Sequence, residues 1–474
     1  MKERNEFLGT EPVGKLVARL AMPAIAAQLI NMLYNVVDRI YIGHMPGDGT
    51  LALTGLGVCM PVIMIVSAFA ALVSMGGAPR ASIFMGKGDN ASAERTLGNC
   101  MSLQLILSVV LTAVLLIWNR DFLLAFGASE NTIEYASGYM NIYAIGTVFV
   151  QLTLGLNAFI TAQGFASMGM FTVLIGAVAN IILDPIFIFG FHMGVQGAAL
   201  ATILSQAISA VWVIRFLRGK KTILRLKKEN FGLGPKIILP CVALGLAPFI
   251  MQASESVLAV CFNASLLRYG GDVAVGAMTI LTSVMQFTML PMQGLAQGAQ
   301  PVSSYNFGAG NAKRVKQTFW LLLKCSVVYS TLMWAAVMAF PRLFAGIFTP
   351  DAALMDYSQW ALRIYFAVSA LMGVQIACQM TFISIGNAKS SIAVAVMRKF
   401  VLLIPLIYIL PAIFENQTMA VYLAEPVADF IAVVFTACLF AIQFRKALKG
   451  LGPQLPGEEA AGGLASPEPG GEGI

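Results

Sequence analysis

One stretch near the N-terminus decides the fold: Pro23-Ala-Ile-Ala-Ala-Gln-Leu-Ile-Asn-Met-Leu-Tyr-Asn-Val-Val-Asp-Arg-Ile-Tyr-Ile-Gly43. It is long and apolar enough to cross a bilayer, which takes ~20 residues of helix. It nevertheless contains Asp38, and a charged side chain at the bilayer centre costs ~2.5–3.5 kcal/mol on insertion scales. Tyr34 precedes Asp38 by four residues, so the two share one helix face. We expect that face, extended by Asn31 and Asn35, to point toward protein or trapped water.

The composition of the whole chain indicates a protein that crosses a membrane many times. Of its 474 residues, 58% are hydrophobic and 11% are charged, against ~25% charged residues in soluble proteins. The mean hydropathy is +0.79. The 7 Cys residues occur singly, without CxxC spacing, and the 2 His residues are too few for a multi-His site. We therefore expect no metal site of that kind and no cofactor.

Apolar runs of ~20 residues predict twelve transmembrane helices, all-α and joined mostly by short turns. The predicted spans are residues 16–42, 52–76, 96–118, 136–160, 168–190, 195–217, 237–262, 273–299, 318–340, 358–384, 391–413 and 419–443. A longer basic segment, residues 218–236, interrupts the series at its centre. From residue 447 to 474 the chain becomes rich in Pro, Gly, Glu and Ala, which predicts a disordered tail.

The positions of Lys and Arg predict the orientation in the membrane. Of the 30 such residues, we assign 24 to the side of the two termini and the central linker, and this count includes Arg398 and Lys399. Three more (Arg39, Lys324 and Arg363) fall within spans. Both termini are therefore expected in the cytoplasm of a cell-membrane protein. Because the basic excess is a topology signal, the net charge of +7 does not indicate a nucleic-acid partner.

An internal repeat divides the chain into two halves. The segment from Gly76 to Gly88 (GGAPRASIFMGKG) matches the segment from Gly298 to Gly310 (GAQPVSSYNFGAG) at an offset of 222 residues. Each half then has six helices, and parallel repeats of this kind occur in transporters that rock about a central site. We predict an N-terminal bundle at residues 1–217, a cytoplasmic linker at 218–236, a C-terminal bundle at 237–446 and a tail at 447–474.

A second polar cluster lies in the fifth predicted span, as Asn180-Ile-Ile-Leu-Asp184-Pro185. Asn180 and Asp184 repeat the four-residue spacing of Tyr34 and Asp38. If both carboxylates face one low-dielectric cavity, they cannot easily both be ionised. Such a pair can take up a proton or hold Na⁺ with oxygen ligands, together with Asn180. The alternative is that each Asp only forms hydrogen bonds between helices.

These motifs resemble the MATE (multidrug and toxic compound extrusion) family, and in particular its DinF-like branch. The residues that carry the resemblance are Pro23, Tyr34-Asn35-Val-Val-Asp38, Asn157, Asn180 to Pro185 and the duplicated Pro-x-x-Ser-x-x-x-Gly-x-Gly turns. It covers about residues 10–446 and implies two six-helix bundles in a V shape. It also implies a proton or Na⁺ coupling site at Tyr34, Asp38, Asn180 and Asp184, with Asn157 and Thr202 nearby. Pro23 matches a proline at which the first helix is thought to bend.

The C-terminal half departs from a second branch of the family, which uses acidic residues in helices seven and ten. Helix seven has Glu255, but helix ten offers Arg363 and no carboxylate. Glu255 could pair with Arg363 or could contact a cationic substrate. For Glu425 and Asp429 in helix twelve we favour a structural or interfacial role. The substrate-binding candidates, drawn from helices one, seven and eight, are Asn35, Gln252, Glu255, Met285, Gln286 and Met289.

The resulting expectation is a secondary-active exporter and not an enzyme. It would release small cationic or lipophilic compounds, including antibiotics, in exchange for H⁺ or Na⁺, and would act as a monomer among membrane lipids. Cation binding at Asp38 and Asp184 would bend helix one near Pro23. A flippase for an anionic lipid-linked precursor is the alternative within the superfamily, but only three Lys or Arg residues were assigned to the spans. A membrane receptor or enzyme is a less favoured alternative, because the spans contain no catalytic constellation of His, Ser or metal ligands.

Overall fold

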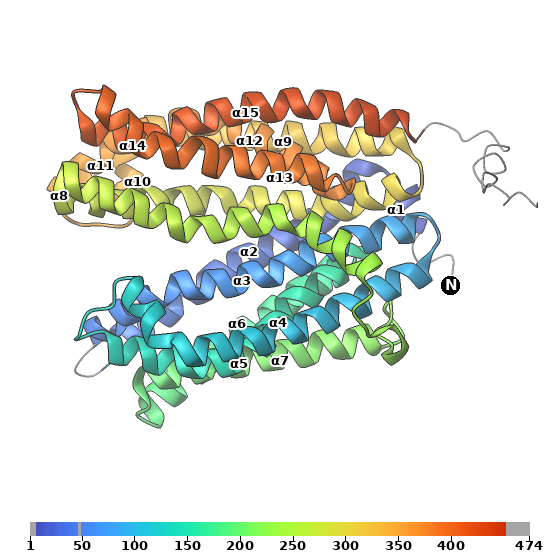
Figure 1. The fold of residues 1–474 in the computed structure, drawn as a ribbon, viewed down its shortest axis with the longest axis horizontal. Helices are drawn as coiled ribbons and strands as arrows, with labels where there is room; N and C mark the ends of the chain where they lie inside the picture. Colours follow the sequence, from blue (N-terminus) through green and yellow to red (C-terminus); the bar gives the residue numbers. More distant parts are fainter. Residues whose placement is uncertain (1–5, 46–48, 452–474) are drawn as a thin grey trace, which may run out of the picture.

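The structure, a computed structural model, describes residues 6–45 and 49–451, and in them the chain is built of helices (Figure 1). The elements of the first half are α1 (Glu6–Thr10), α2 (Val13–Gly43), α3 (Gly49–Gly86), α4 (Asn90–Ala125), α5 (Ile133–Ala162), α6 (Ala166–Pro185), the π-helix η2 (Ile186–Gly190) and α7 (Gly194–Arg218). Those that follow are the 3-10 turn η3 (Lys228–Asn230), α8 (Pro235–Gly308), α9 (Ala312–Ala339), α10 (Pro341–Gly346), α11 (Ala352–Tyr365), the 3-10 turn η4 (Ser369–Leu371), α12 (Met372–Ser384), α13 (Ala388–Val396), the π-helix η5 (Met397–Leu403), α14 (Ile404–Ile413) and α15 (Gln417–Lys449).

These helices make twelve membrane crossings, as predicted. α8 has 74 residues, which at ~1.5 Å per residue is far longer than the ~30 Å core of a bilayer. It reverses at Gly271, whose φ of 67° lies in a region that L side chains rarely adopt. We call residues 235–270 the first arm of α8 and residues 272–308 the second arm. α11 and α12 form one crossing bent by 50°, and α13, η5 and α14 run on as a single one, from Ala388 to Ile413.

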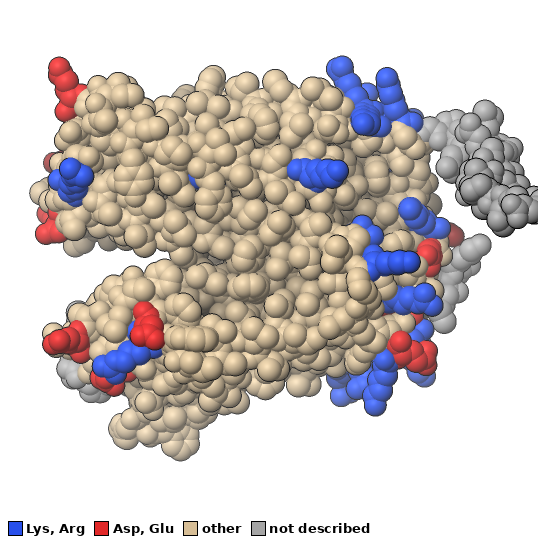
Figure 2. All heavy atoms as spheres, in the orientation of Figure 1, with Lys and Arg blue, Asp and Glu red and all other residues tan. Residues whose placement is uncertain are grey.

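The crossings form two bundles that lie against each other. α2 to α7 make the N-terminal bundle, and α8 to α15 make the C-terminal bundle (Figure 1). The start of α2 and the end of α15 lie at the same end of the molecule, where Lys and Arg also gather (Figure 2). We call this the basic end and the opposite one the far end. Figure 2 shows a hollow between the bundles that opens at the far end. The arrangement is the V shape that was expected.

The structure reproduces the sequence repeat in its turns. Gly88 and Gly310, which are 222 residues apart, follow α3 and α8 with φ values of 79° and 71°. The next residues cap the following helices in the same way. Asp89 accepts a hydrogen bond from the Ser92 amide at 3.0 Å, and Asn311 accepts one from the Arg314 amide at 3.1 Å. The two halves therefore share both a fold and the local chemistry of their turns.

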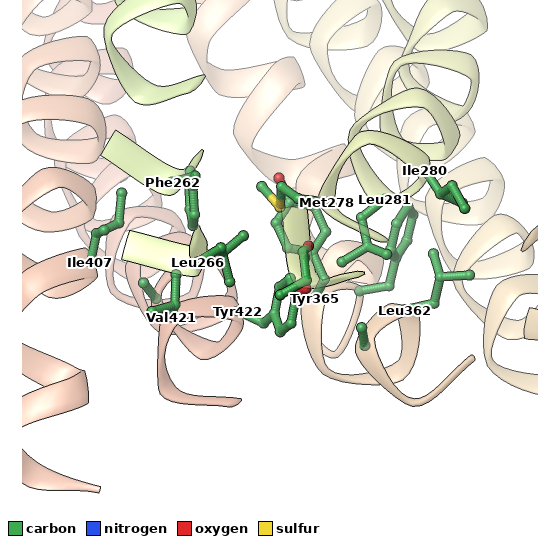
Figure 3. Packing of buried hydrophobic residues seen from close by; sticks show 14 of the residues in the cluster. Phe262, Leu266, Met278, Ile280, Leu281, Leu362, Tyr365, Ile407, Val421 and Tyr422 are labelled. Atoms are coloured by element: carbon green, nitrogen blue, oxygen red, sulfur yellow. Dashed lines mark hydrogen bonds between the residues drawn. The ribbon is translucent and has the colours of Figure 1, made fainter. Parts of the chain in front are cut away.

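Each bundle has an apolar interior, shown for the C-terminal bundle in Figure 3. Tyr422 is 0% exposed there, and its hydroxyl donates to the carbonyl of Ala274 at 2.7 Å. It packs near Phe262, Leu266 and Tyr365. Lipid tails are as apolar as these side chains, so close packing and internal hydrogen bonds, rather than escape from water, hold such helices together.

At the basic end, the linker between the bundles is anchored to the N-terminal bundle. The Gln163 side-chain oxygen accepts from the Thr222 hydroxyl at 2.9 Å and from the Leu224 amide at 2.8 Å. The Asn99 side-chain oxygen accepts from the Gly234 amide at 2.8 Å. At the C-terminus, α15 extends to Lys449. The part of the predicted tail from 452 onward lies outside the described residues, as do residues 1–5 and 46–48.

Candidate functional site

Two carboxyl groups from distant segments meet inside the N-terminal bundle. Asp38 lies on α2 and is 9% exposed, while Asp184 lies at the end of α6 and is 0% exposed. The two side chains interact with each other. One oxygen of each, Oδ1 of Asp38 and Oδ2 of Asp184, is buried without a hydrogen-bond partner in the structure. A buried carboxylate oxygen without a partner is costly, and a proton or a small cation would relieve that cost.

Asn180 completes this pair, as its spacing from Asp184 predicted. Its amide donates to Asp184 Oδ1 at 3.3 Å, while its own Oδ1 is buried without a partner. The helix changes its hydrogen-bond pattern directly after Pro185, where residues Ile186–Gly190 form the π-helix η2. Pro185 has no amide hydrogen to donate, and π-helical turns are frequent at functional sites. Oxygen atoms from two carboxylates and an amide are therefore available to coordinate one small cation.

Two tyrosine side chains lie near the carboxylate pair. Tyr34 is half-buried on α2 and interacts with both Asp38 and Asp184. Tyr139 on α5 is 3% exposed and interacts with Asp38 and with the Thr202 side chain of α7. Thr202 is thus a neighbour of Tyr139. We did not expect Tyr139 from the sequence, because a tyrosine inside an apolar helix is usually a packing residue.

Two of the predicted residues make contacts elsewhere. The Asn157 amide donates to the carbonyl of Gly169 at 3.2 Å, and Gly169 is eleven residues before Asn180 on α6, or ~16 Å along the helix. The structure therefore does not bring Asn157 to the carboxylate pair. Asn35 donates to the carbonyl of Asn31 at 2.6 Å, within α2 itself.

Pro23 lies inside α2, which continues without interruption from Val13 to Gly43. It cannot donate to the carbonyl of Arg19, four residues earlier, so the helix has one hydrogen bond fewer there. Just around it, α2 packs against the second arm of α8. A Cβ atom on Gly298 would collide with the Cα of Ala21, and one on Gly294 would lie 2.6 Å from the Cα of Ile25. The proline thus lies where α2 meets the C-terminal bundle.

The C-terminal bundle contains a second charged cluster, which corrects two sequence interpretations. Glu255 forms an ion pair with Lys399 at 2.6 Å, so the suggested pairing with Arg363 is wrong, and Arg363 is exposed on α11. Arg398 and Lys399 are 8% and 3% exposed and belong to η5, within the crossing Ala388–Ile413. Assigning them to the cytoplasmic side was therefore also wrong.

The residues suggested for substrate binding are divided between the two arms of α8. Gln252 is half-buried and Glu255 is exposed on the first arm. On the second arm, Gln286 is exposed, Met289 is half-buried and Met285 packs against the interior of the C-terminal bundle. Their role in substrate binding stays a prediction.

Comparisons with known proteins agree with this architecture. The MatE family model matches residues 23–186 and 248–409. The multidrug export protein MepA of Staphylococcus haemolyticus is 24% identical over 436 residues, which are 91% of this chain and 95% of MepA. A solved ligand complex of the MATE multidrug transporter DinF-BH is 32% identical, with a TM-score of 0.87 over 95% of this chain and 100% of that one. A MATE structure in the bent conformation has a TM-score of 0.88 at 22% identity, covering 95% of this chain and 99% of that one. The chain belongs to the MATE family of multidrug and toxic compound extrusion transporters.

Proposed function

We propose that this protein is a secondary-active exporter of cationic or lipophilic small molecules, driven by the inward movement of H⁺ or Na⁺. Membership in the MATE family supports transport, and the names of MepA and DinF-BH support drug export. The observation that carries the coupling is the buried pair of Asp38 and Asp184, with two carboxylate oxygens that lack a partner. We further propose that the basic end faces the cytoplasm, as Lys and Arg distributions predict.

The coupling mechanism follows from what a cation does to the carboxylate pair. Without a cation, the negative charges of Asp38 and Asp184 repel each other, and α2 and α6 are held apart. A proton or Na⁺ entering from the far end joins the two side chains and draws the outer part of α2 toward α6. Because Pro23 leaves α2 short of one hydrogen bond, we propose that the helix bends there. The movement narrows the space between α2 and α6 inside the N-terminal bundle and releases the substrate outward.

The energy available to this cycle is sufficient for drug accumulation. One positive charge that moves inward through ~100 mV releases ~2.3 kcal/mol. That free energy corresponds to about a fiftyfold concentration ratio if the cycle moves one net charge.

The experiment is dye efflux from membrane vesicles with imposed H⁺ or Na⁺ gradients. Asp38→Asn and Asp184→Asn should each abolish gradient-driven efflux. Asp356→Asn is the matched control, because that carboxylate is 62% exposed in its pair with Arg342. Undiminished efflux in both site variants would refute the coupling role, and comparing the two gradients identifies the ion.

Arg398 and Lys399 raise the number of cations inside the crossings, and this number bears on the flippase alternative. A binding site for an anionic lipid-linked precursor would be basic. The two cations, however, face three carboxylates, Glu255, Glu425 and Asp429. The cluster has no excess of positive charge, which favours drug export over that alternative.

A further inference from the structure

The charged cluster of the C-terminal bundle has no role in the coupling mechanism described above. Its two cations, Arg398 and Lys399, lie near the middle of the crossing Ala388–Ile413. Lys399 is about 16 Å along the helix from Ala388 and about 21 Å from Ile413. Neither side chain can extend to the membrane surface over such distances. Ionisable groups at this depth are rare and usually functional.

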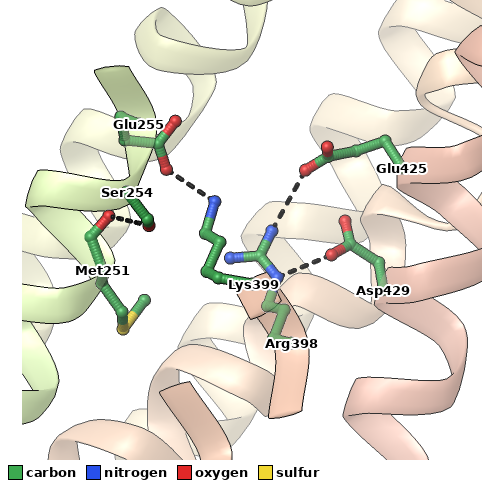
Figure 4. Close-up of polar contacts among 7 residues, drawn as sticks. All are labelled: Met251, Ser254, Glu255, Arg398, Lys399, Glu425 and Asp429. Carbon is green, nitrogen blue, oxygen red and sulfur yellow. Dashed lines mark hydrogen bonds and ion pairs between the residues drawn. The ribbon is translucent and has the colours of Figure 1, made fainter. Parts of the chain in front are cut away.

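The two cations point toward opposite walls of the bundle (Figure 4). Arg398 faces α15, where its Nε is 2.7 Å from Asp429 Oδ1 and a terminal nitrogen is 3.4 Å from Glu425 Oε1. The exposed fractions of the Arg398, Asp429 and Glu425 side chains are 10%, 4% and 8%. This part of the cluster is closed and structural.

Lys399 faces the first arm of α8, and its pair is accessible from one side. Its Nζ donates to Glu255 Oε1 at 2.6 Å. The Lys399 side chain is 4% exposed, whereas that of Glu255 is 49% exposed. The π-helical geometry of η5 lies at this position, and such turns often occur at functional sites. The pair therefore presents an anion at a surface and holds a cation directly behind it.

Ionisable side chains inside a membrane crossing face protein or a water-filled cavity rather than lipid, so we take the exposed side of Glu255 to face the space between the bundles. The first arm of α8 packs along α3 from the basic end, with Gly245 against Leu72 and the rings of Phe249 and Phe69 4.9 Å apart. Ser256, the neighbour of Glu255, donates to the carbonyl of Pro61 at 3.5 Å. One turn closer to the far end, Val260 is 53% exposed. Glu255 thus lies beside a contact between the two bundles, next to the Ser256–Pro61 hydrogen bond.

We propose that Glu255 and Lys399 form a substrate subsite for zwitterionic molecules, which carry an amine and a carboxylate. The inference rests on the proposed export function and specifies its substrate class. A simple organic cation that binds Glu255 competes with Lys399 and leaves a buried ammonium without a counter-charge, which is unfavourable. A zwitterion replaces one ion pair with two, because its amine binds Glu255 and its carboxylate binds Lys399. Gln252, which is half-buried one turn earlier on α8, adds an amide close to Glu255.

The test is equilibrium binding to the purified full-length protein in lipid nanodiscs, with no ion gradient. The probes are a rhodamine with a free carboxylate and the methyl ester of the same dye, which is a simple cation of nearly equal size. The wild-type protein should bind the free acid about tenfold more tightly than the ester, a difference of ~1.4 kcal/mol. Lys399→Gln should abolish or reverse that preference by strengthening ester binding. Glu255→Gln should weaken ester binding and enlarge the preference.

Further variants separate the charge effect from altered folding. Lys399→Arg should keep the wild-type preference, and the double variant Glu255→Gln/Lys399→Gln should bind both dyes equally. Arg363→Gln removes an exposed cation from the same bundle and should change neither affinity. If Lys399→Gln does not fold, Glu255→Gln decides the question by itself, since its carboxamide has nearly the same shape as the carboxylate.

A wild-type acid-to-ester ratio near one, or equal ratios in the wild type, Lys399→Gln and Glu255→Gln, would overturn the subsite. The readout is binding and not transport, so the two proposals fail separately. Loss of the export function would appear as absent efflux with intact binding. Loss of the subsite would appear as unchanged binding ratios in a protein that still exports.

Discussion

Gly86 lies against the backbone carbonyl of Tyr305, so closely that a Cβ atom on Gly86 would overlap that oxygen. The same contact occurs a second time with the halves exchanged. A Cβ atom on Gly308 would overlap the carbonyl oxygen of Ile83. Both pairs are related by the offset of 222 residues. The two bundles therefore meet at the basic end through a reciprocal backbone contact, as a pseudo-twofold axis between them requires.

Substituting Gly86 or Gly308 should separate the bundles at the basic end. Gly86→Val and Gly308→Val each place a branched side chain where a carbonyl oxygen already lies. We expect a loss of ~1–3 kcal/mol of stability from overpacking and a shift away from the conformation that is closed there. The measurement is thermal unfolding in detergent together with dye efflux. Gly57→Val is the control on the same helix, because a Cβ atom at Gly57 contacts nothing within 4 Å. Similar losses in all three variants would contradict the expectation.

The closed part of the C-terminal cluster should be sensitive to which carboxylate is removed. Asp429 is 2.7 Å from Arg398, whereas Glu425 is 3.4 Å from it. Breaking a buried ion pair costs ~3–5 kcal/mol, so Asp429→Ala should lower the unfolding temperature strongly. Glu425→Ala should lower it less, because Arg398 keeps its shorter contact. Glu134→Ala, which removes a carboxylate that is 74% exposed, should have little effect. A larger loss for Glu425→Ala than for Asp429→Ala would contradict this ranking.

The two repeated helix caps predict a difference in pH dependence between the halves. Hydrogen bonds from Ser92 lower the pKa of Asp89 below its ordinary value of 3.8. The folded state therefore favours the ionised carboxylate, so the cap is complete at neutral pH. It is lost as the pH falls below 3.8 and through the lowered pKa. Asn311, the equivalent cap of α9, does not titrate in this range. Acidification should reduce amide protection at the start of α4 and leave α9 unchanged, which hydrogen exchange can measure. Asp89→Asn should remove the difference.

Much of the fold could be predicted because membrane crossings and repeats have strong sequence signals. Twelve apolar runs, the repeated turns at Gly88 and Gly310 and the spacing of Asn180 and Asp184 are all local patterns. The contact between Asp38 and Asp184 could be predicted for a different reason. A carboxylate in a bilayer needs a partner or a function, and the first half of the chain offers two in membrane spans.

The C-terminal cluster could not be predicted, because its pairing depends on distant helices. Lys399 and Glu255 are 144 residues apart along the chain. Adjacent Arg398 and Lys399, directly before the apolar stretch that begins at Phe400, look like a membrane-surface signal. Their carboxylate partners belong to α8 and α15, and the π-helical turn that directs them has no clear sequence mark. Tyr139 was missed for a related reason, since its contact with Thr202 depends on how α5 packs against α7.

Arg314 should control whether the N-terminal segment remains attached at the basic end. Its side chain donates to the carbonyls of Glu11 at 2.7 Å and Leu8 at 3.1 Å, and to Asn306 Oδ1 at 2.9 Å. Arg314→Lys keeps the charge but cannot reproduce the planar fork that serves all three acceptors. Because a hydrogen bond from a charged group contributes ~1.5–3 kcal/mol, losing even one should release the segment before α2. Limited proteolysis and amide exchange of residues 8–11 measure that release.

Lys316→Arg, on an exposed position of the same helix, is the control. Since Leu8 also packs with Leu16 and with α8 residues such as Val302, its release should weaken the closure of the basic end. Equal protection in Arg314→Lys and the wild type would show that the apolar contacts hold the segment without the guanidinium.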